Sequence, residues 1–323
     1  MRTDRFHRIV CVSTLVLSAL VLSARLAAAQ NAAPDTGPLA LLLPASARAA
    51  AIGNAAVAGR DEYAVFQNPA RLNATTGFGM TLATYGASTR ALAAASASTI
   101  GPVTLGWALQ AVDFTAPRTS TAYPVAPASL LSGGESDAFS LVAMVSGAMT
   151  YKGFRIGTSV KYAEDMVRRN STDLPVVALP SRGAAWLLDI GTSHPLWTGI
   201  AGLSLQNVGQ PYLLRGTPYS VPTQLALGWS AQYAWGPFDY GFHTQVTARR
   251  NGWVSPAAGF ELGWSWIDGY NVTLRAGAHR TETADEKPVG AGFSFGADRL
   301  NLDYGASFYS GSQMAHRLTV RWR

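Results

Sequence analysis

The sequence of 323 residues predicts an all-β fold, namely a transmembrane, antiparallel, up-and-down β-barrel of about 14 strands with an N-terminal hatch or plug segment. Three observations support this prediction. Short stretches alternate between apolar and polar residues with the period of two that a β-strand imposes. The connections between them are long and short in turn. Only 14% of the residues are charged, although 48% are hydrophobic. A large secreted β-sandwich is the alternative that shares this composition.

The first residues have the features of an export signal. A basic start precedes the apolar run from Ile9 to Leu22, and Ala27-Ala28-Ala29 offers an A-x-A cleavage site. We therefore expect residues 1–29 to be a signal peptide. Its removal lowers the net charge from +6 to +3, and no nucleic-acid-binding surface is expected. It also removes the only cysteine, so disulfides cannot stabilise the mature chain.

Residues 30–75 lack strand alternation and precede the first expected strand. We expect a flexible lead followed by a hatch inside the barrel; an ordinary periplasmic extension is the alternative. Ser46 can cap a short helix over the alanines that follow, and Gly53 can end it. Asn68-Pro69-Ala70 lies just before the first strand. Because proline fixes its own φ and pushes the preceding residue toward extended geometry, this tripeptide is expected to form a rigid elbow.

The barrel is expected to occupy residues 76–323. Each strand reaches the roughly 9–11 residues that a tilted strand needs to cross the hydrocarbon. Near the C-terminus, for example, Leu300 and Leu302 share an apolar face, whereas Asn301 and Asp303 lie on the opposite, polar face. Twelve or sixteen strands are also possible. The expected strands are 76–88, 90–101, 103–114, 137–150, 153–166, 183–194, 199–208, 223–235, 238–249, 253–266, 270–280, 288–297, 300–310 and 314–322.

The connections predict the orientation in the membrane. Long stretches rich in Pro, Ser, Gly and Thr fall at 115–136, 167–182 and 209–222, and short turns fall at positions such as Gly236-Pro237 and Asp298-Arg299. Long loops are expected outside the cell, with the short turns and both termini in the periplasm. Aromatic residues cluster beside the short turns, as in the girdle at a membrane interface, although aromatics also favour β-strands in general.

Two short motifs flank the acidic pair Asp61-Glu62 in the segment before the first strand. The hatch motif consists of Ala47, Arg48, Gly53, Asn68, Pro69 and Ala70. This pattern resembles the N-terminus of the PorV/PorQ branch of the FadL-like outer-membrane proteins. That family typically shows Ala-Arg-x-x-x-Met/Leu-Gly-x-Ala, an acidic stretch, and then Asn-Pro-Ala-x-Leu just before the first strand. The resemblance implies a fourteen-stranded barrel with the N-terminal segment tucked inside.

The resemblance implies two roles, both without enzymatic activity. PorV-like proteins work with the type IX secretion system on exported protein cargo, and the short loops and Ala47-Arg48 favour this role here. FadL-like transport of hydrophobic small molecules is the alternative, and a structural barrel without a conduit is a third possibility. The expected location is integral in the outer membrane of a Gram-negative-type bacterium. The expected partners are outer-membrane lipid, the barrel-assembly machinery, and possible type IX secretion components or exported cargo.

Catalytic, metal-binding and cofactor-binding residues are not predicted. The sequence has no H-E-x-x-H motif, and it has no acidic loop with calcium-binding spacing. His243 and Asp239 alternate onto the same, inner face, where such a pair could activate a serine or a water molecule. Polar residues facing the lumen are, however, expected on every strand of such a barrel.

Several charged residues alternate onto the inner face of the strands. Charges in a low-dielectric wall need partners, so pairing across the lumen is expected, and lining a path is the alternative. Arg48 and Arg71 of the N-terminal segment are expected to pair with wall carboxylates and hold the segment in place. The predicted lumen-facing charges are Arg155, Lys161, Asp189, Glu261, Arg275 and Asp303, together with Arg317 and Arg321.

Overall fold

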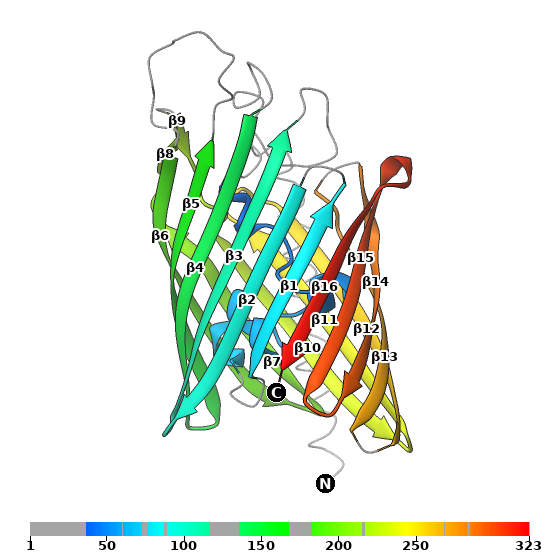
Figure 1. Ribbon diagram of the computed structural model, residues 1–323. Helices are drawn as coiled ribbons and strands as arrows, with labels where there is room; N and C mark the ends of the chain where they lie inside the picture. Colours follow the sequence, from blue (N-terminus) through cyan, green and yellow to red (C-terminus); the bar gives the residue numbers. More distant parts are fainter. Residues whose placement is uncertain are drawn as a thin grey trace.

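The computed structural model is a closed barrel of fourteen antiparallel strands (Figure 1). It describes residues 37–59, 61–72, 77–86, 89–116, 136–167, 182–214, 217–267, 269–282 and 285–322. Strands adjacent in sequence pair with each other, except that β7 pairs with β10, and β1 pairs with β16 to close the cylinder. Closure removes free sheet edges. The predicted fold class is confirmed.

The predicted strands are all present, with ends close to those expected. The strand predicted at 238–249, for example, is β11 (Phe238–Arg249). The other barrel strands are β1 (Phe78–Tyr85), β2 (Thr89–Ile100), β3 (Val103–Ala116), β4 (Ser136–Tyr151), β5 (Phe154–Val167), β6 (Arg182–Leu196), β7 (Gly199–Gly209), β10 (Gln224–Trp235), β12 (Val254–Ile267), β13 (Tyr270–His279), β14 (Glu286–Ala297), β15 (Leu300–Tyr309) and β16 (Met314–Trp322).

The two ends of the barrel differ in their connections. At one end, here called the short-turn end, tight turns join strand pairs such as β4 and β5. Their turn residues Lys152 and Gly153 have φ values of 49° and 84°, as a two-residue hairpin requires. Strand β16 also ends there (Figure 1). The predicted long stretches at 115–136 and 167–182 connect strands at the opposite, long-loop end; most of their residues lie outside the described part.

The stretch predicted as the third long loop contains a small hairpin. Strands β8 (Tyr212–Leu214) and β9 (Thr217–Tyr219) pair with each other between β7 and β10. The rings of Tyr212 and Tyr219 stack with centroids 5.8 Å apart, and both residues are buried. This hairpin was not predicted from the sequence.

The outer surface of the barrel is apolar around its circumference. Large side chains such as Leu82, Val145 and Leu274 point outward and are more than half exposed, at 53%, 63% and 56%. Exposed aromatic residues, including Trp235 and Trp322, lie at strand ends on the short-turn side. Acyl chains of lipids cover such a surface in outer-membrane barrels. The helices in the described residues are too short or too polar to span a membrane.

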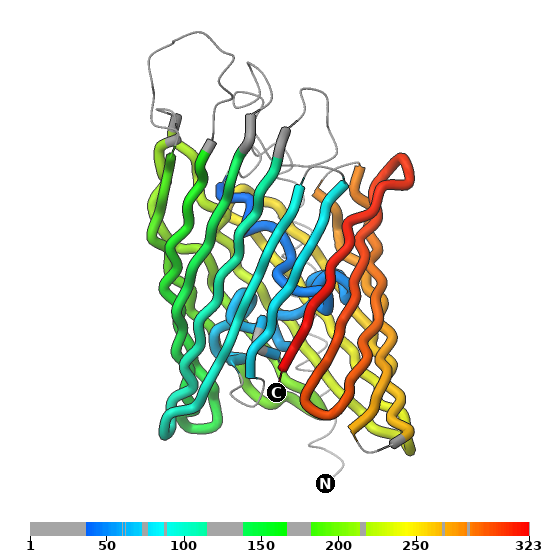
Figure 2. The backbone as a smooth tube through the Cα atoms, in the orientation of Figure 1, coloured from blue at the N-terminus to red at the C-terminus, as the bar shows by residue number. Residues whose placement is uncertain are grey.

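The barrel encloses residues 37–59 and 61–72, here called the N-terminal segment (Figure 2). It contains η1 (Leu39–Leu41), α2 (Ala47–Ala51), η2 (Glu62–Phe66) and η3 (Pro69–Arg71). The short helix predicted from the sequence is confirmed, because the Ser46 side chain accepts a hydrogen bond from the Ala49 N–H, and Gly53 follows the helix with φ 65°.

The N-terminal segment descends through the lumen from the long-loop end. It begins at Gly37, beside Pro222 in the connection to β10, and α2 then packs against β13 to β16. Helix η3 packs against β4, β5 and β6 before the chain enters β1. Residues 1–29 and 30–36 lie outside the described residues, so the expected signal peptide and lead stay predictions, as does the division at residue 75.

Candidate functional site

The elbow at Asn68-Pro69-Ala70 attaches the end of the N-terminal segment that precedes β1 to the barrel wall. Asn68 is extended, with φ −158° and ψ 107°, and its side-chain oxygen accepts a hydrogen bond from the Ala70 N–H. The Asn68 side-chain amide donates to the carbonyls of Val57 in the segment and Thr192 in the wall. Asn68 is fully buried. The tripeptide therefore joins two parts of the segment to strand β6.

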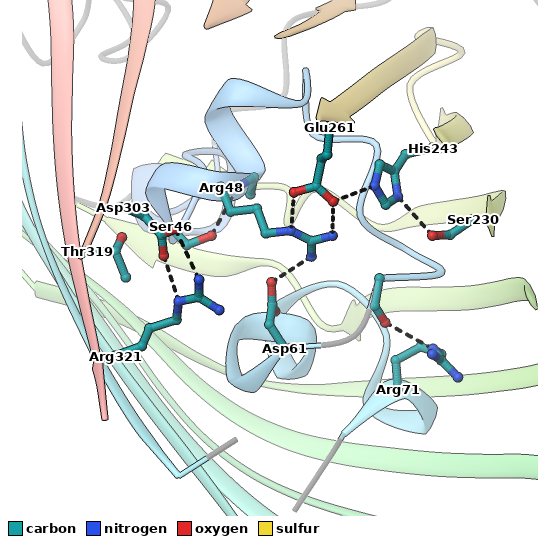
Figure 3. A network of polar contacts seen from close by, with 12 residues as sticks. Ser46, Arg48, Asp61, Arg71, Ser230, His243, Glu261, Asp303, Thr319 and Arg321 are labelled. Carbon is teal, nitrogen blue, oxygen red and sulfur yellow. Dashed lines mark hydrogen bonds and ion pairs between the residues drawn. The ribbon is translucent and has the colours of Figure 1, made fainter. Parts of the chain in front are cut away.

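A chain of ion pairs links α2 of the N-terminal segment to the wall (Figure 3). The Arg48 guanidinium donates to both oxygens of Glu261, with Nη2–Oε2 at 2.7 Å and Nε–Oε1 at 2.9 Å. Arg48 also pairs with Asp61 of the segment at 2.9 Å. On the wall, Arg275 bridges Glu261 at 2.6 Å and Asp303 at 2.7 Å. Bidentate pairs of this kind are strong and fix the position of both partners.

The electrostatic balance at Arg48 favours its charged form. Burial alone would lower the pKa of the Arg48 guanidinium, but the carboxylates of Glu261 and Asp61 outweigh burial and hold this pKa well above its ordinary value. The pair is nearly dry, because the side chains of Arg48 and Glu261 are only 9% and 8% exposed. Removing one partner of such a pair leaves the other as an uncompensated buried charge.

A second ion pair stabilises the wall itself. Lys161 of β5 lies 2.6 Å from Asp189 of β6, and its ammonium also donates to the side-chain oxygen of Asn207. Asn207 has φ 58°, at a register shift between β6 and β7. Its N–H donates to Asp189, and its amide donates to Pro222 O. These contacts hold the place where β7 separates from β10.

Arg155 and Arg71 each donate to a backbone carbonyl of the N-terminal segment. Arg155 donates to the carbonyl of Leu72 at 2.6 Å and to Thr104 Oγ1 at 2.8 Å. The Arg71 Nε–H donates to Gly59 O, within the segment. Of the two pairings expected for the segment arginines, the structure therefore shows the one between Arg48 and Glu261, whereas Asp189 pairs with Lys161, and Asp303 with Arg275 and Arg321.

Glycines on the inner face of the wall allow the segment to approach closely. A Cβ atom built on Gly157 would lie less than 3.0 Å from the backbone of Pro69, and one built on Gly277 would lie equally close to the backbone of Ile52. Real Cβ atoms do not make contacts this short, so only glycine fits at these positions. The wall glycines that contact the segment, here called the glycine ring, are Gly106, Gly157, Gly191, Gly202, Gly228, Gly259, Gly277, Gly290, Gly292 and Gly305.

Apolar side chains form a core cluster in the lumen beside β2 to β6. Leu39, Val65 and Leu72 of the segment are at most 4% exposed and belong to one cluster with small and medium side chains of the wall. Tyr212 and Tyr219 of the loop hairpin complete the cluster at the long-loop end. This half of the lumen is packed as a protein core is packed.

A cavity of about 150 Å³ lies between the segment and the wall on the long-loop side. One side is apolar and consists of Leu39 to Ala45, with Val142 and Met144 of β4. The polar part of the lining comes mainly from β10 to β16 and their connections, including Gln245, Trp253, Arg280 and Arg317, and β3, β5 and β7 add Gln110, Lys161, Gln206 and Asn207. The cavity therefore has two chemically different faces.

One hydrogen-bonded series resembles a nucleophile with its base. Ser230 Oγ lies 2.9 Å from His243 Nδ1, and His243 Nε2 lies 2.8 Å from Glu261 Oε2 (Figure 3). The Glu261 carboxylate, however, is shared with two arginines, and none of the three residues lines the cavity. Among the described residues there is no group of three or more His, Cys, Asp or Glu that could hold a metal ion.

The structure places all predicted site residues in the lumen, although their roles stay predictions. Ala47, Arg48, Gly53, Asn68, Pro69 and Ala70 lie in the N-terminal segment, and the six charges lie on the inner face of the wall. Glu261, Arg275 and Asp303 meet in one network with Arg48, whereas Arg155, Lys161 and Asp189 lie elsewhere. The glycine ring was not predicted, although glycines recur in the sequence at inner-face positions of many strands.

Comparison with known proteins finds similarity in structure only. No family model and no curated protein matches the sequence. The toluene transporter TbuX of Ralstonia pickettii has a TM-score of 0.55 at 14% identity, over 86% of this chain and 98% of that one. The monoaromatic hydrocarbon channel CymD gives 0.58 at 11%, over 87% and 98%. The toluene transporter TodX of Pseudomonas putida gives 0.57 at 11%, over 89% and 98%.

These structural neighbours are outer-membrane barrels of the FadL family, and they are channels and transporters rather than enzymes. At such low identity the likeness shows the fold alone. The comparisons show neither the PorV/PorQ assignment nor a type IX secretion role.

Proposed function

We propose that this chain is an integral outer-membrane protein that passes small, largely apolar molecules into the cell envelope. The observation that carries the proposal is the cavity of about 150 Å³ beside Leu39 to Ala45. An apolar cavity of about this size in another protein is known to hold benzene. The neighbours described as toluene transporters and as a monoaromatic hydrocarbon channel support the same class of cargo.

The proposal includes an orientation and a route of assembly. The long-loop end faces the outside of a Gram-negative-type cell, so the cavity receives its ligand from there. The apolar outer surface faces lipid, and the barrel-assembly machinery inserts the chain. The N-terminal segment closes the lumen beneath the cavity, because it contacts strands on all sides of the wall.

Uptake into proteoliposomes tests the proposal. The wild-type protein is expected to accelerate the entry of toluene over that in protein-free vesicles. Ala257→Trp fills the cavity from the wall and should abolish most of this acceleration, because Ala257 is a lining residue. Ala258→Trp is the matched control, since the neighbouring side chain points outward. Absence of any acceleration by the wild-type protein would contradict the proposal, and equal uptake through Ala257→Trp would contradict passage through the cavity.

A role in type IX secretion is the second candidate, and the motif from Ala47 to Ala70 favours it. On this reading the barrel handles exported protein cargo, and the motif residues serve to fix the segment that closes the lumen. Co-purification of type IX components with the full chain from its native membrane would support this role. A barrel that neither conducts solute nor retains such components would be a structural scaffold.

A further inference from the structure

Two arginines on the polar face of the cavity have no acidic partner among the described residues. Arg317 is only 1% exposed, and its guanidinium lies over the ring of Tyr85, 4.7 Å from the centroid. It donates from Nη1 to Ser307 Oγ and from Nη2 to the Tyr85 hydroxyl, both neutral groups. Its buried Nε–H has no hydrogen-bond partner in the part of the chain that the structure describes. A buried, uncompensated cation of this kind is costly.

Arg280 repeats the arrangement at the rim of the cavity. Its guanidinium lies over the ring of Trp253, 4.3 Å from the centroid, and donates to the carbonyl of Val254 at 3.2 Å. Both arginines line the same cavity. Stacking on an aromatic face holds a guanidinium in place and leaves its N–H edge free to bind a planar anion.

Most of the other charges around the cavity are paired, but the contact of Glu286 with His279 balances the Glu286 charge only when the imidazole is protonated. Arg249 pairs with Glu282 at 2.5 Å. Glu286 lies 3.1 Å from the His279 ring. Lys161 is bound to Asp189 of the wall. The cavity therefore keeps a net positive charge, which comes from Arg280 and Arg317.

We propose that this cavity binds a small organic acid, with its apolar body against Leu39 to Ala45 and its carboxylate at Arg317. Arg280 contributes to the positive potential at the entrance. The inference rests on the proposed function and narrows its cargo to amphipathic anions of roughly the size of benzoate. Carboxylates match the flat donor edge of a guanidinium, and a charge-assisted hydrogen bond is about twice as strong as a neutral one.

The size of the cavity excludes a long acyl chain from being held there entirely. A volume of about 150 Å³ accepts a single aromatic ring. The continuous apolar stretch of the lining is short as well, because it ends at Ala45, just before Ser46 caps α2. A ligand with one ring and one carboxylate uses both faces of the cavity.

Calorimetric titration of the full-length protein in detergent tests the inference. The ligands are benzoate, the neutral analogue benzyl alcohol, toluene and palmitate, all at constant ionic strength. Benzoate is expected to bind at least about tenfold more tightly than benzyl alcohol, as for one hydrogen bond to a charged group. In Arg317→Gln the two affinities should become nearly equal. Arg317→Lys, which keeps the positive charge, should retain part of the preference.

Each outcome decides for or against the organic acid. Equal or tighter binding of benzyl alcohol, toluene or palmitate overturns the inference, and so does an unchanged preference in Arg317→Gln. If Arg317→Gln does not fold, Arg280→Gln takes its place with a smaller expected loss, and the wild-type series already tests the charge preference. Vesicle uptake distinguishes failure of the organic-acid hypothesis from failure of the proposed transport function. Entry of toluene without any preference for the acid refutes only this inference, whereas no entry of either refutes the proposed function.

Discussion

The two halves of the lumen hold the same N-terminal segment by different forces. Between β2 and β7, buried side chains such as Val65 and Leu72 pack against apolar wall residues. Between β10 and β16, the segment is held by the bidentate pair of Arg48 with Glu261 and by the network behind it. Packing is tolerant of direction, whereas ion pairs fix position. We therefore expect the ion pairs of the polar half to fix where α2 sits, whereas the other half adds packing and the hydrogen bonds of Asn68 and Leu72 to the wall.

The largest effect is expected from breaking the polar half. Arg48→Ala leaves Glu261 and Asp61 buried without their shared cation, which costs about 3–5 kcal/mol. We expect the segment to loosen on this side and single-channel conductance to rise well above that of the wild type. Arg90→Ala, at an exposed position on β2, is the control. Unchanged conductance in Arg48→Ala would show that packing alone positions the segment.

A smaller effect is expected in the apolar half. Leu72→Ala removes a side chain that is 1% exposed and contacts the wall at Gly106, so stability should fall by about 2–5 kcal/mol. Conductance should stay close to that of the wild type, because the ion pairs still fix the segment. The denaturation midpoint in detergent measures the loss, with the lipid-facing Leu82→Ala as control. A rise in conductance equal to that of Arg48→Ala would remove the distinction between the two halves.

The glycine ring extends over both halves of the lumen. Substituting one of its glycines by alanine adds a methyl group and tests whether close approach of the segment requires glycine. Gly277→Ala places a Cβ atom against the backbone of Ile52, so the segment must shift, at a cost of about 1–3 kcal/mol. Gly147→Ala is the matched control, because its Cβ would meet only a Leu105 methyl at an ordinary 3.7 Å. We expect faster proteolysis of the segment in Gly277→Ala alone. Equal proteolysis of the two variants would argue against close fit as the function of these glycines.

Strand positions could be predicted from the sequence because the residue pattern of each strand reflects the lipid on one face and the lumen on the other. Lipid on one side and lumen on the other impose a period of two on every strand, and turns such as Lys152-Gly153 mark where it stops. The short helix and the elbow were equally local, because Ser46 and Pro69 act on their own neighbours. Such features need no knowledge of the rest of the chain.

Features that depend on two distant parts of the chain were not predictable in this way. A glycine on the inner face of β13 looks like a weak strand position until Ile52 is placed beside it. Alternation placed Glu261 in the lumen, but it could not choose between Arg48 and Arg71 as its partner. The hairpin of β8 and β9 was hidden because its tyrosines are buried against residues far away in sequence. The lack of an acidic partner for Arg317 among the described residues also became visible only once its neighbours in the lumen were placed.

The smallest effect is expected from substituting Ser230, which lies in a hydrogen-bonded series that resembles a serine–histidine–carboxylate catalytic site. A serine–histidine–carboxylate series needs a carboxylate that is free to stabilise the charged imidazole. Glu261 is instead held by Arg48 and Arg275, and the series lies away from the cavity. We therefore expect a fluorophosphonate probe to label wild-type protein no more than Ser230→Ala, as measured by mass spectrometry. Labelling of Ser230 would mean that these ion pairs leave a working nucleophile, and that the polar half does more than position the segment.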